Sequence, residues 1–173
     1  MLIRKAVFKD VASINDIYNS AVLKGYTAHT IPITQADRFI WFHKHDNNAY
    51  PIFVAELAGQ IIGWLSLSAY RPGRQALKHT AEISYYIAEE YRNQGIGTRL
   101  VKEALHEAPL YGFTNLISII LENNTGSIRL IEKAGFKKWG FLPEVANING
   151  RLCGHLYYGL KYFTQPNGIS CCF

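Results

Sequence analysis

The stretch Arg92-Asn93-Gln94-Gly95-Ile96-Gly97 separates two segments whose sequences follow different patterns. Before it, residues 81–87 (Ala-Glu-Ile-Ser-Tyr-Tyr-Ile) form an apolar run typical of a strand. After it, residues 98–105 (Thr-Arg-Leu-Val-Lys-Glu-Ala-Leu) favour a helix. Backbone N–H groups are free at a helix start, and the helix dipole favours negative charge there. The stretch therefore predicts an anion site in a turn between a strand and a helix.

The glycines of this loop indicate which anion it suits. Gly95 and Gly97 allow the backbone to approach a pyrophosphate closely, and Arg92 can add a charge-assisted hydrogen bond. The pattern lacks the Lys-Ser/Thr pair that ends a P-loop and the third glycine of the Rossmann fingerprint. The predicted binding loop also contains Asn93, Gln94, Ile96 and Thr98.

Composition excludes several classes of protein. Of the 173 residues, 49% are apolar and 18% are charged, which excludes disorder. No apolar run reaches the ~20 residues needed to span a bilayer, so we expect no membrane association. The start, residues 1–5, lacks the apolar stretch of a signal peptide, and we therefore expect a cytoplasmic protein. Three cysteines, Cys153, Cys171 and Cys172, suit neither a disulfide framework nor a zinc site, so we expect no metal.

The net charge of +5 raises the question of nucleic-acid binding. Lysines and arginines are scattered along the chain, without the basic and aromatic interleaving of an RNA-binding sheet. A modest positive field also suits a polyanionic cofactor. We therefore expect no nucleic-acid partner.

The order of elements predicts an α/β chain that forms one domain over residues 1–163, with a frayed tail at 164–173. Asp10 is the expected N-cap of a helix that ends at Gly25, and Thr34 that of a helix reaching Lys44. Further helices are expected from Gly95 to Ala108 and at residues 127–133. Strands are expected at residues 2–7, 52–57, 60–69, 81–87, 116–121, 137–141 and 152–162, in a mixed sheet with helices on both faces.

The loop matches the (Gln/Arg)-x-x-Gly-x-(Gly/Ala) signature of acetyl-CoA-dependent N-acetyltransferases of the GNAT superfamily, which this chain resembles over residues 3–159. Within the superfamily it is most similar to the phosphinothricin and methionine sulfoximine acetyltransferase branch. The carrying segments are 17–20, 80–87, 122–124 with Ser127, 132–136 and 140–146. The resemblance implies a mixed, mostly antiparallel sheet in which two splayed strands bind acetyl-CoA.

The resemblance also assigns residues to the cofactor. The backbone of Tyr85, Tyr86 and Ile87 would pair with the pantetheine arm, and Asn124 and Ser127 would face the cofactor. The Asn-x-x-Ser spacing is equally that of a helix cap, and the three strand residues equally suit an ordinary buried strand.

Glu82 is the candidate general base. Alternation places Glu82, Ser84 and Tyr86 on one face of the strand. Partial burial would raise the pKa of Glu82 toward the range of a base that removes a proton from an amine, directly or through water. The alternative is a solvated strand glutamate.

The sequence leaves open which groups protonate the thiolate and bind the substrate. Many GNAT enzymes protonate the thiolate with a tyrosine where this chain has Ile131, so water or another tyrosine must serve. In the loop 71–77, Arg74 can clamp a substrate carboxylate or remain solvated, and Gln75 and Leu77 alter the pocket that the branch usually has. The branch usually has acidic residues at the positions of His29 and Ile31. His79 can assist proton transfer or be structural.

We therefore expect acetyl-CoA-dependent N-acetylation of a small amino-acid-like amine. Two alternatives stay open: acetylation of a peptide or protein N-terminus, and a non-catalytic acyl-CoA-binding module, against which Glu82 speaks. The family commonly dimerises, and the last strand, residues 156–163, is rich in large apolar side chains for an edge element. This predicts a homodimer, unless these side chains cover the domain's own core.

Overall fold

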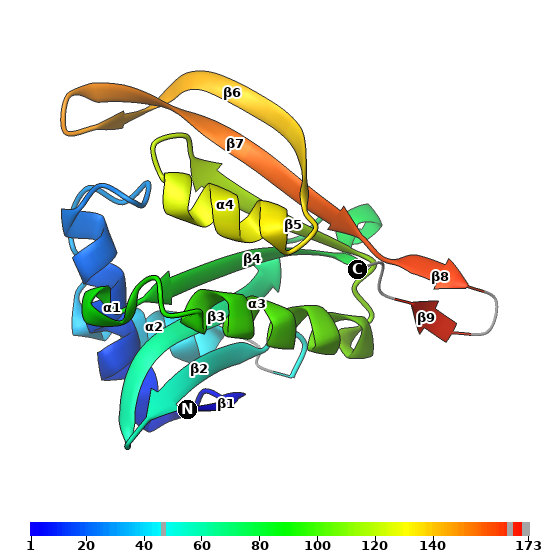
Figure 1. Ribbon diagram of the computed structural model, residues 1–173, viewed down its shortest axis with the longest axis horizontal. Coiled ribbons are helices and arrows are strands. Elements are labelled where there is room, and N and C mark those ends of the chain that lie inside the picture. The colour runs from blue at the N-terminus through cyan, green and yellow to red at the C-terminus, as the bar shows by residue number, and fades with distance from the viewer. Residues whose placement is uncertain (46–47, 166–167, 171–173) are drawn as a thin grey trace.

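A seven-stranded mixed sheet forms the centre of the molecule, with the strand order β1-β2-β3-β4-β5-β7-β6 (Figure 1). The computed structural model describes residues 1–45, 48–165 and 168–170, and side chains up to residue 162. The strands are β1 (Leu2–Lys5), β2 (Ile52–Leu57), β3 (Gln60–Ala69), β4 (Thr80–Ile87), β5 (Asn115–Leu121), β6 (Lys137–Ile148) and β7 (Arg151–Lys161). Within the described part of the chain, β4 and β5 are the only strands of this sheet that pair in parallel, which confirms the mostly antiparallel sheet.

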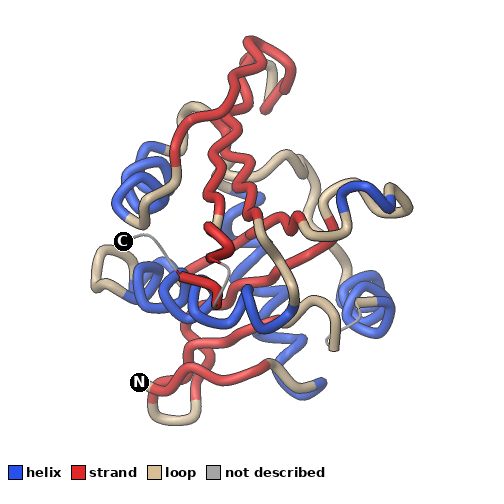
Figure 2. Tube along the Cα trace, turned by 90° about the vertical axis from the view of Figure 1, so that its right-hand side faces the viewer, coloured by secondary structure: helices blue, strands red, loops and turns tan. Residues whose placement is uncertain are grey.

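Helices cover both faces of this sheet, as predicted (Figure 2). They are α1 (Val11–Leu23), α2 (Gln35–Lys44), α3 (Ile96–Glu107) and α4 (Thr125–Lys133), with short 3-10 turns η1 (Phe8–Asp10), η2 (Gln75–Leu77), η3 (Glu89–Tyr91) and η4 (Ala108–Tyr111). On one face, Leu100 and Ile131 of α3 and α4 pack on Ile83 and Leu116. On the other, Ile14 of α1 and Phe42 of α2 pack with Trp64. Among the described residues, no helix is long and apolar enough to cross a membrane.

Strands β4 and β5 separate partway along their length. Thr80–Glu82 of β4 pair with Asn115–Ile117 of β5, and residues 83–87 of β4 have no partner on β5. On its other side β4 stays paired with β3 up to Ile87. This confirms the predicted splay and leaves one edge of β4 facing a gap in the sheet.

Several local predictions are confirmed. The hairpin between β2 and β3 turns at Ala58 and Gly59, which have φ of +49° and +82°. Thr34 caps α2, because its Oγ1 accepts a hydrogen bond from the Asp37 N–H at 3.1 Å. Strand β6 is longer than predicted and runs to Ile148, because it pairs with β7 over most of that strand.

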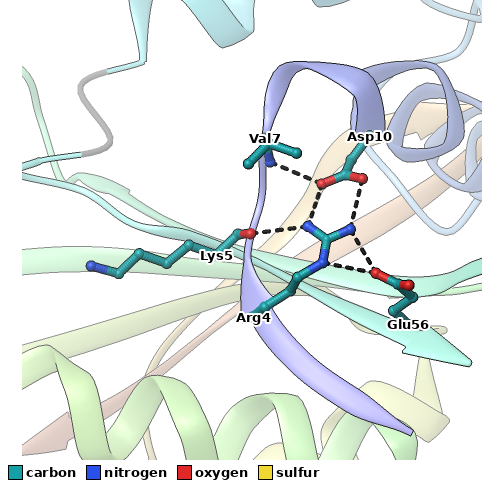
Figure 3. Close-up of polar contacts among 5 residues, drawn as sticks. All are labelled: Arg4, Lys5, Val7, Asp10 and Glu56. Carbon is teal, nitrogen blue, oxygen red and sulfur yellow. Dashed lines mark hydrogen bonds and ion pairs between the residues drawn. The ribbon is translucent and has the colours of Figure 1, made fainter. Parts of the chain in front are cut away.

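Asp10 does not act as the predicted side-chain cap of α1. Its carboxylate instead accepts hydrogen bonds from Arg4 at 2.6 and 2.9 Å and from the Val7 N–H at 2.9 Å (Figure 3). Arg4 also contacts Glu56 on β2 at 2.7 Å. A buried carboxylate prefers a cation to a neutral N–H group, since charge-assisted bonds offset more of its desolvation. The cluster ties β1 and β2 to the start of α1.

One expectation about the C-terminal part is wrong. The last long strand, β7, is not an edge, because it lies between β5 and β6, and β6 and β1 form the edges of the sheet. Leu156 and Tyr158 of β7 are buried in the core beside α3 and α4. After β7, β8 (Phe163–Gln165) pairs with β9 (Gly168–Ser170). Cys171 and Cys172 lie outside the described residues.

Candidate functional site

Two cavities meet at the splay of β4 and β5. The first, called here the sheet cavity, has a volume of about 640 Å³ and is bounded by α2, β3, β4, β5, β7 and the loop 26–29. The second, the loop cavity, has a volume of about 620 Å³ and lies between the loop before α3 and the start of α4. Five residues line both cavities: Tyr26, Tyr85, Tyr86, Asn124 and Ser127. The two cavities therefore share a wall where the strands part.

The loop cavity contains most of the predicted anion loop. Asn93 and Gly95 have φ of +60° and +79°, and a Cβ added to Gly95 would meet no protein atom within 4 Å. Such left-handed positions curl the backbone so that successive N–H groups can face one anion. No side chain caps the first turn of α3, which leaves its N–H groups available. The lining residues from this loop are Arg92, Asn93, Gly95, Ile96, Gly97 and Thr98.

Gln94 differs from its neighbours. It does not line the loop cavity, and its amide donates to the Glu90 carbonyl at 2.9 Å. Arg92 is held in place by a bond from Nε to the Ile87 carbonyl at 3.3 Å and by the ring of Tyr26, 5.4 Å away. Gln94 thus shapes the loop, whereas Arg92 presents its charge at the cavity.

Two cations missed by the sequence analysis also line the loop cavity. Arg129 and Lys133 lie four residues apart on α4, which places them on one face of that helix. Together with Arg92 they make the cavity basic. This donor set fits the phosphates of coenzyme A: three cations, two helix starts and a glycine with open space above its Cα. The i, i+4 spacing in a helix after the loop was the signal that would have found the pair.

The wall between the cavities is fixed by hydrogen bonds. Asn124 Oδ1 accepts from the Ser127 N–H at 3.2 Å, so the capping alternative is present, and both residues also line the cavities. The Tyr85 hydroxyl donates to the Ser127 carbonyl at 3.1 Å. Tyr85, Tyr86 and Ile87, predicted for their backbone, all line the loop cavity. Their strand edge faces the splay.

Glu82 lines the sheet cavity and is half-buried. Among the described residues its carboxylate has no hydrogen-bond or ion-pair partner, and burial raises its pKa above the usual range of glutamate. Ser68 lies opposite it on β3, and Ser66 lies opposite Ser84. All four residues line the cavity. The arrangement suits a proton acceptor with polar groups beside it that could hold water.

The residues predicted for substrate binding are not brought to this site. Arg74, Gln75 and Leu77 lie in or beside η2 and line neither cavity. His79 bonds the Gly112 carbonyl through Nδ1 at 2.9 Å, which is a structural contact outside both cavities. Ile131 is fully buried in the core. The loop 71–77 is displaced from the cavity because β3 and β4 pair up to Ala69 and Ala81, at the end remote from the splay.

Sequence reasoning missed a buried cluster around Arg38 that lines the sheet cavity. Arg38 of α2 is only 4% exposed and lies among the rings of Tyr18, Trp41 and Trp64. A helical arginine three residues from a tryptophan gives no sign in the sequence that α2 faces a cavity. His29, where the branch usually has an acid, bonds the Tyr18 hydroxyl through Nδ1 and lines the same cavity.

Comparison with known proteins agrees with this geometry. Residues 12–136 match the acetyltransferase (GNAT) family. The chain is 33% identical over 153 residues to the L-methionine sulfoximine/L-methionine sulfone acetyltransferase of Pseudomonas aeruginosa, covering 86% of this chain and 87% of that protein. It is 31% identical over 175 residues to the L-amino acid N-acyltransferase MnaT of Escherichia coli, covering 98% and 100%.

A solved structure gives the same result. The phosphinothricin acetyltransferase of Sinorhizobium meliloti, in complex with acetyl-CoA, has a TM-score of 0.87 at 30% identity, covering 92% of this chain and 87% of that one. The fold of this chain agrees with that structure. This chain therefore belongs to the GNAT family of acetyltransferases.

Proposed function

We propose that this protein transfers the acetyl group of acetyl-CoA to the amino group of a small amino-acid-like substrate. The carrying observation is that Glu82 lies in a cavity that shares a wall with the basic loop cavity. An acyl donor in one cavity and an amine in the other would meet at this wall. The cavity volume of about 640 Å³ is in the range for small-molecule ligands.

The substrate class is supported by the relatives' names. They describe acetyl transfer to methionine sulfoximine and methionine sulfone, and N-acyl transfer to L-amino acids. A non-catalytic acyl-CoA-binding module would have no use for a carboxylate kept half-buried without a partner, as Glu82 is, because such burial costs free energy.

The proposed chemistry divides between the co-substrate and the chain. Acetyl-CoA supplies an activated acetyl group: the neutral amine would attack its carbonyl carbon, the C–N bond would form, the C–S bond would break, and coenzyme A would leave as a thiolate that takes up a proton. Arg92, Arg129 and Lys133 would bind its phosphates together with the N–H groups at the start of α3. Glu82 would remove the proton of the ammonium group, whose pKa of about 8–10 keeps most of it charged at neutral pH. Ser66, Ser68 and Ser84 would hold water for this transfer.

A thiol-release assay tests the proposal. Purified protein and acetyl-CoA are mixed with L-methionine sulfone, L-methionine sulfoximine, phosphinothricin, other L-amino acids and peptides with free N-termini. We expect turnover with at least one of the small amino acids and none with the peptides. Turnover with peptides only would favour N-terminal acetylation instead. Tight binding of acetyl-CoA without turnover on any amine would favour the non-catalytic module.

We also propose that the protein is a homodimer, through the hairpin of β6 and β7 rather than through residues 156–163. Large apolar side chains are exposed on the edge strand β6 and on β7: Trp139, Phe141, Leu142, Val145 and Leu152. Figure 1 shows the β6–β7 hairpin projecting beyond the helices. Such a patch on an unpaired edge is typical of an interface. A cytoplasmic location stays a prediction from the sequence.

Light scattering at micromolar concentration tests the dimer. We expect a mass of two chains for the wild type and of one chain for Val145→Ser combined with Leu152→Ser. Leu110→Ser, at a position 74% exposed on η4, is the matched control and should stay dimeric. A monomeric wild type would refute the proposal.

A further inference from the structure

Arg38 is a buried cation that has no carboxylate partner in the part of the chain that the structure describes. Its Nε donates to Asn15 Oδ1 at 3.2 Å, which is a neutral acceptor, and its Nη2 is buried with no hydrogen-bond partner among the described residues. Its Cζ lies 4.4 Å from the ring centroid of Tyr18 and 4.8 Å from that of Trp41. Burying a guanidinium without a counter-charge is costly, and ring faces offset only part of that cost.

A second donor beside Arg38 is also unpaired. Trp64 Nε1 is buried and has no hydrogen-bond partner within the described ranges, and its ring lies 5.7 Å from Arg38 Cζ. Both residues line the sheet cavity. The neighbouring acid, Asp37, does not neutralise Arg38, because its carboxylate accepts from the Thr34 hydroxyl at 2.7 Å at the exposed start of α2. Asp37 also lines the cavity, but among the described residues no carboxylate is paired with Arg38. This end of the cavity therefore presents two unpaired donors and a positive charge.

We propose that Arg38 and Trp64 form a receptor for the anionic oxygen group of the amine substrate. A carboxylate accepts hydrogen bonds from a guanidinium and from an indole N–H group, and in a desolvated site such bonds are strong. The amine part of this assignment rests on the function proposed above. The receptor itself rests on Arg38 and Trp64 alone, and it replaces the clamp expected at Arg74.

The pairing of β3 with β4 sets the position of the receptor relative to Glu82. Trp64 pairs with Tyr86 across β3 and β4, and Ser68 pairs with Glu82 four residues along. Four residues of a strand span ~13 Å. The Glu82 carboxylate repels an anion and attracts an ammonium group, whereas Arg38 does the reverse. The substrate is thus oriented with its amine toward Glu82 and its acid toward Arg38, which selects zwitterions over neutral amines.

Binding of a substrate analogue without an amino group tests the receptor independently of catalysis. The probes are 4-(methylsulfonyl)butanoate, which is methionine sulfone without its amine, and the corresponding amide. Tryptophan fluorescence and calorimetry report their affinities, with Trp41 and Trp64 as the reporters at the site. We expect the wild type to bind the acid at least tenfold more tightly than the amide, and Arg38→Met to reduce this preference below twofold.

Two further variants keep the test decisive. Arg74→Met removes the other candidate arginine and should preserve the tenfold preference. Arg38→Lys retains the positive charge and should retain part of the preference for the acid over the amide. This variant carries the test if Arg38→Met does not fold, as judged by acetyl-CoA binding and thermal unfolding. Equal affinity of the wild type for acid and amide, or a preference lost in Arg74→Met instead, would overturn the receptor.

The outcomes separate this inference from the proposed function. If the acid is preferred through Arg38 but methionine sulfone and the other amino acids are not acetylated, the receptor stands and the proposed reaction fails. If the amino acids are acetylated as fast as their amides, the reaction stands and the receptor fails.

Discussion

The Tyr85 hydroxyl on β4 donates a hydrogen bond to the Ser127 carbonyl on α4, at 3.1 Å. This bond connects the strand with the helix across the region where β4 and β5 are no longer paired. Both residues line both cavities. Burial raises the pKa of Tyr85, so the hydroxyl stays protonated and remains a donor. The bond therefore fixes the width of the wall at which acyl donor and amine would meet.

Tyr85→Phe should reduce stability by about 1 kcal/mol and weaken acetyl-CoA binding severalfold, because the Ser127 carbonyl loses its donor and α4 its link to β4. Thermal unfolding and calorimetry measure the two effects. Tyr91→Phe is the matched control, since its hydroxyl makes only a 3.4 Å contact with Gln60 at the surface. Equal acetyl-CoA affinity in Tyr85→Phe and the wild type would contradict the role of this bond.

Gly95→Val should weaken acetyl-CoA binding at least tenfold, equivalent to ~1.4 kcal/mol. The valine side chain would fill the open space above the loop and would strain a backbone with φ of +79°. Gly59→Val separates backbone strain from the filling of the phosphate site. Gly59 also has a positive φ of +82° and open space above its Cα, but it lies in the β2–β3 turn. This variant should lose stability and keep its affinity. Unchanged affinity in Gly95→Val would refute the loop as the phosphate site.

Glu82→Gln should bind acetyl-CoA normally and transfer the acetyl group ~10²–10⁴-fold more slowly at neutral pH, because general base catalysis contributes about that factor. Burial raises the pKa of Glu82, so the acid limb of the wild-type rate profile should lie above the ordinary titration range of glutamate. The variant should lack that limb and recover part of its rate as pH rises. If Glu82→Gln kept the full kcat of the wild type across the pH range, Glu82 would have no catalytic role.

The same substitution should raise stability at neutral pH. Because the pKa of Glu82 is raised in the folded state, its contribution to stability is complete below the unfolded pKa of ~4.3 and is lost as pH rises through the folded pKa. Glu82→Gln removes this loss. Its melting temperature should exceed that of the wild type at pH 7.5, and the two should converge near pH 4. A lower melting temperature at pH 7.5 would contradict the assigned desolvation.

Arg4→Met should destabilise the fold by about 2–3 kcal/mol at neutral pH, since it leaves the buried carboxylate of Asp10 without its cation. Burial acts to raise the pKa of Asp10, but hydrogen bonds from Arg4 and the Val7 N–H outweigh it and lower that pKa. This stabilisation is present above the unfolded pKa and is lost as pH falls through the folded one.

The deficit of Arg4→Met in denaturant titrations should therefore shrink in acid. Glu56→Gln is the comparison, because it removes the more exposed partner of Arg4 and should cost less than ~1 kcal/mol. A deficit for Arg4→Met that does not change with pH would contradict the ion pair as its cause.

Local features were predicted well from the sequence. Four of these features depend on residues only a few positions apart: the strand before Arg92, the helix after Gly95, the Ala58-Gly59 turn and the Thr34 cap. Backbone preferences and short hydrogen bonds decide such features, so a short window of sequence contains their causes. The alternation that puts Glu82 on the face of Ser84 and Tyr86 is of the same kind.

Other features were decided only by tertiary structure. The sequence alone determined a glycine loop between a strand and a helix and a carboxylate on the strand before it. Contacts between distant segments decided four other features. They place β7 inside the sheet, pair Asp10 with Arg4, leave Arg74 outside the cavity and bury Arg38. Such contacts depend on strand order and on which helix face is buried, and both are settled only when the whole core packs, because many pairings satisfy the same local preferences.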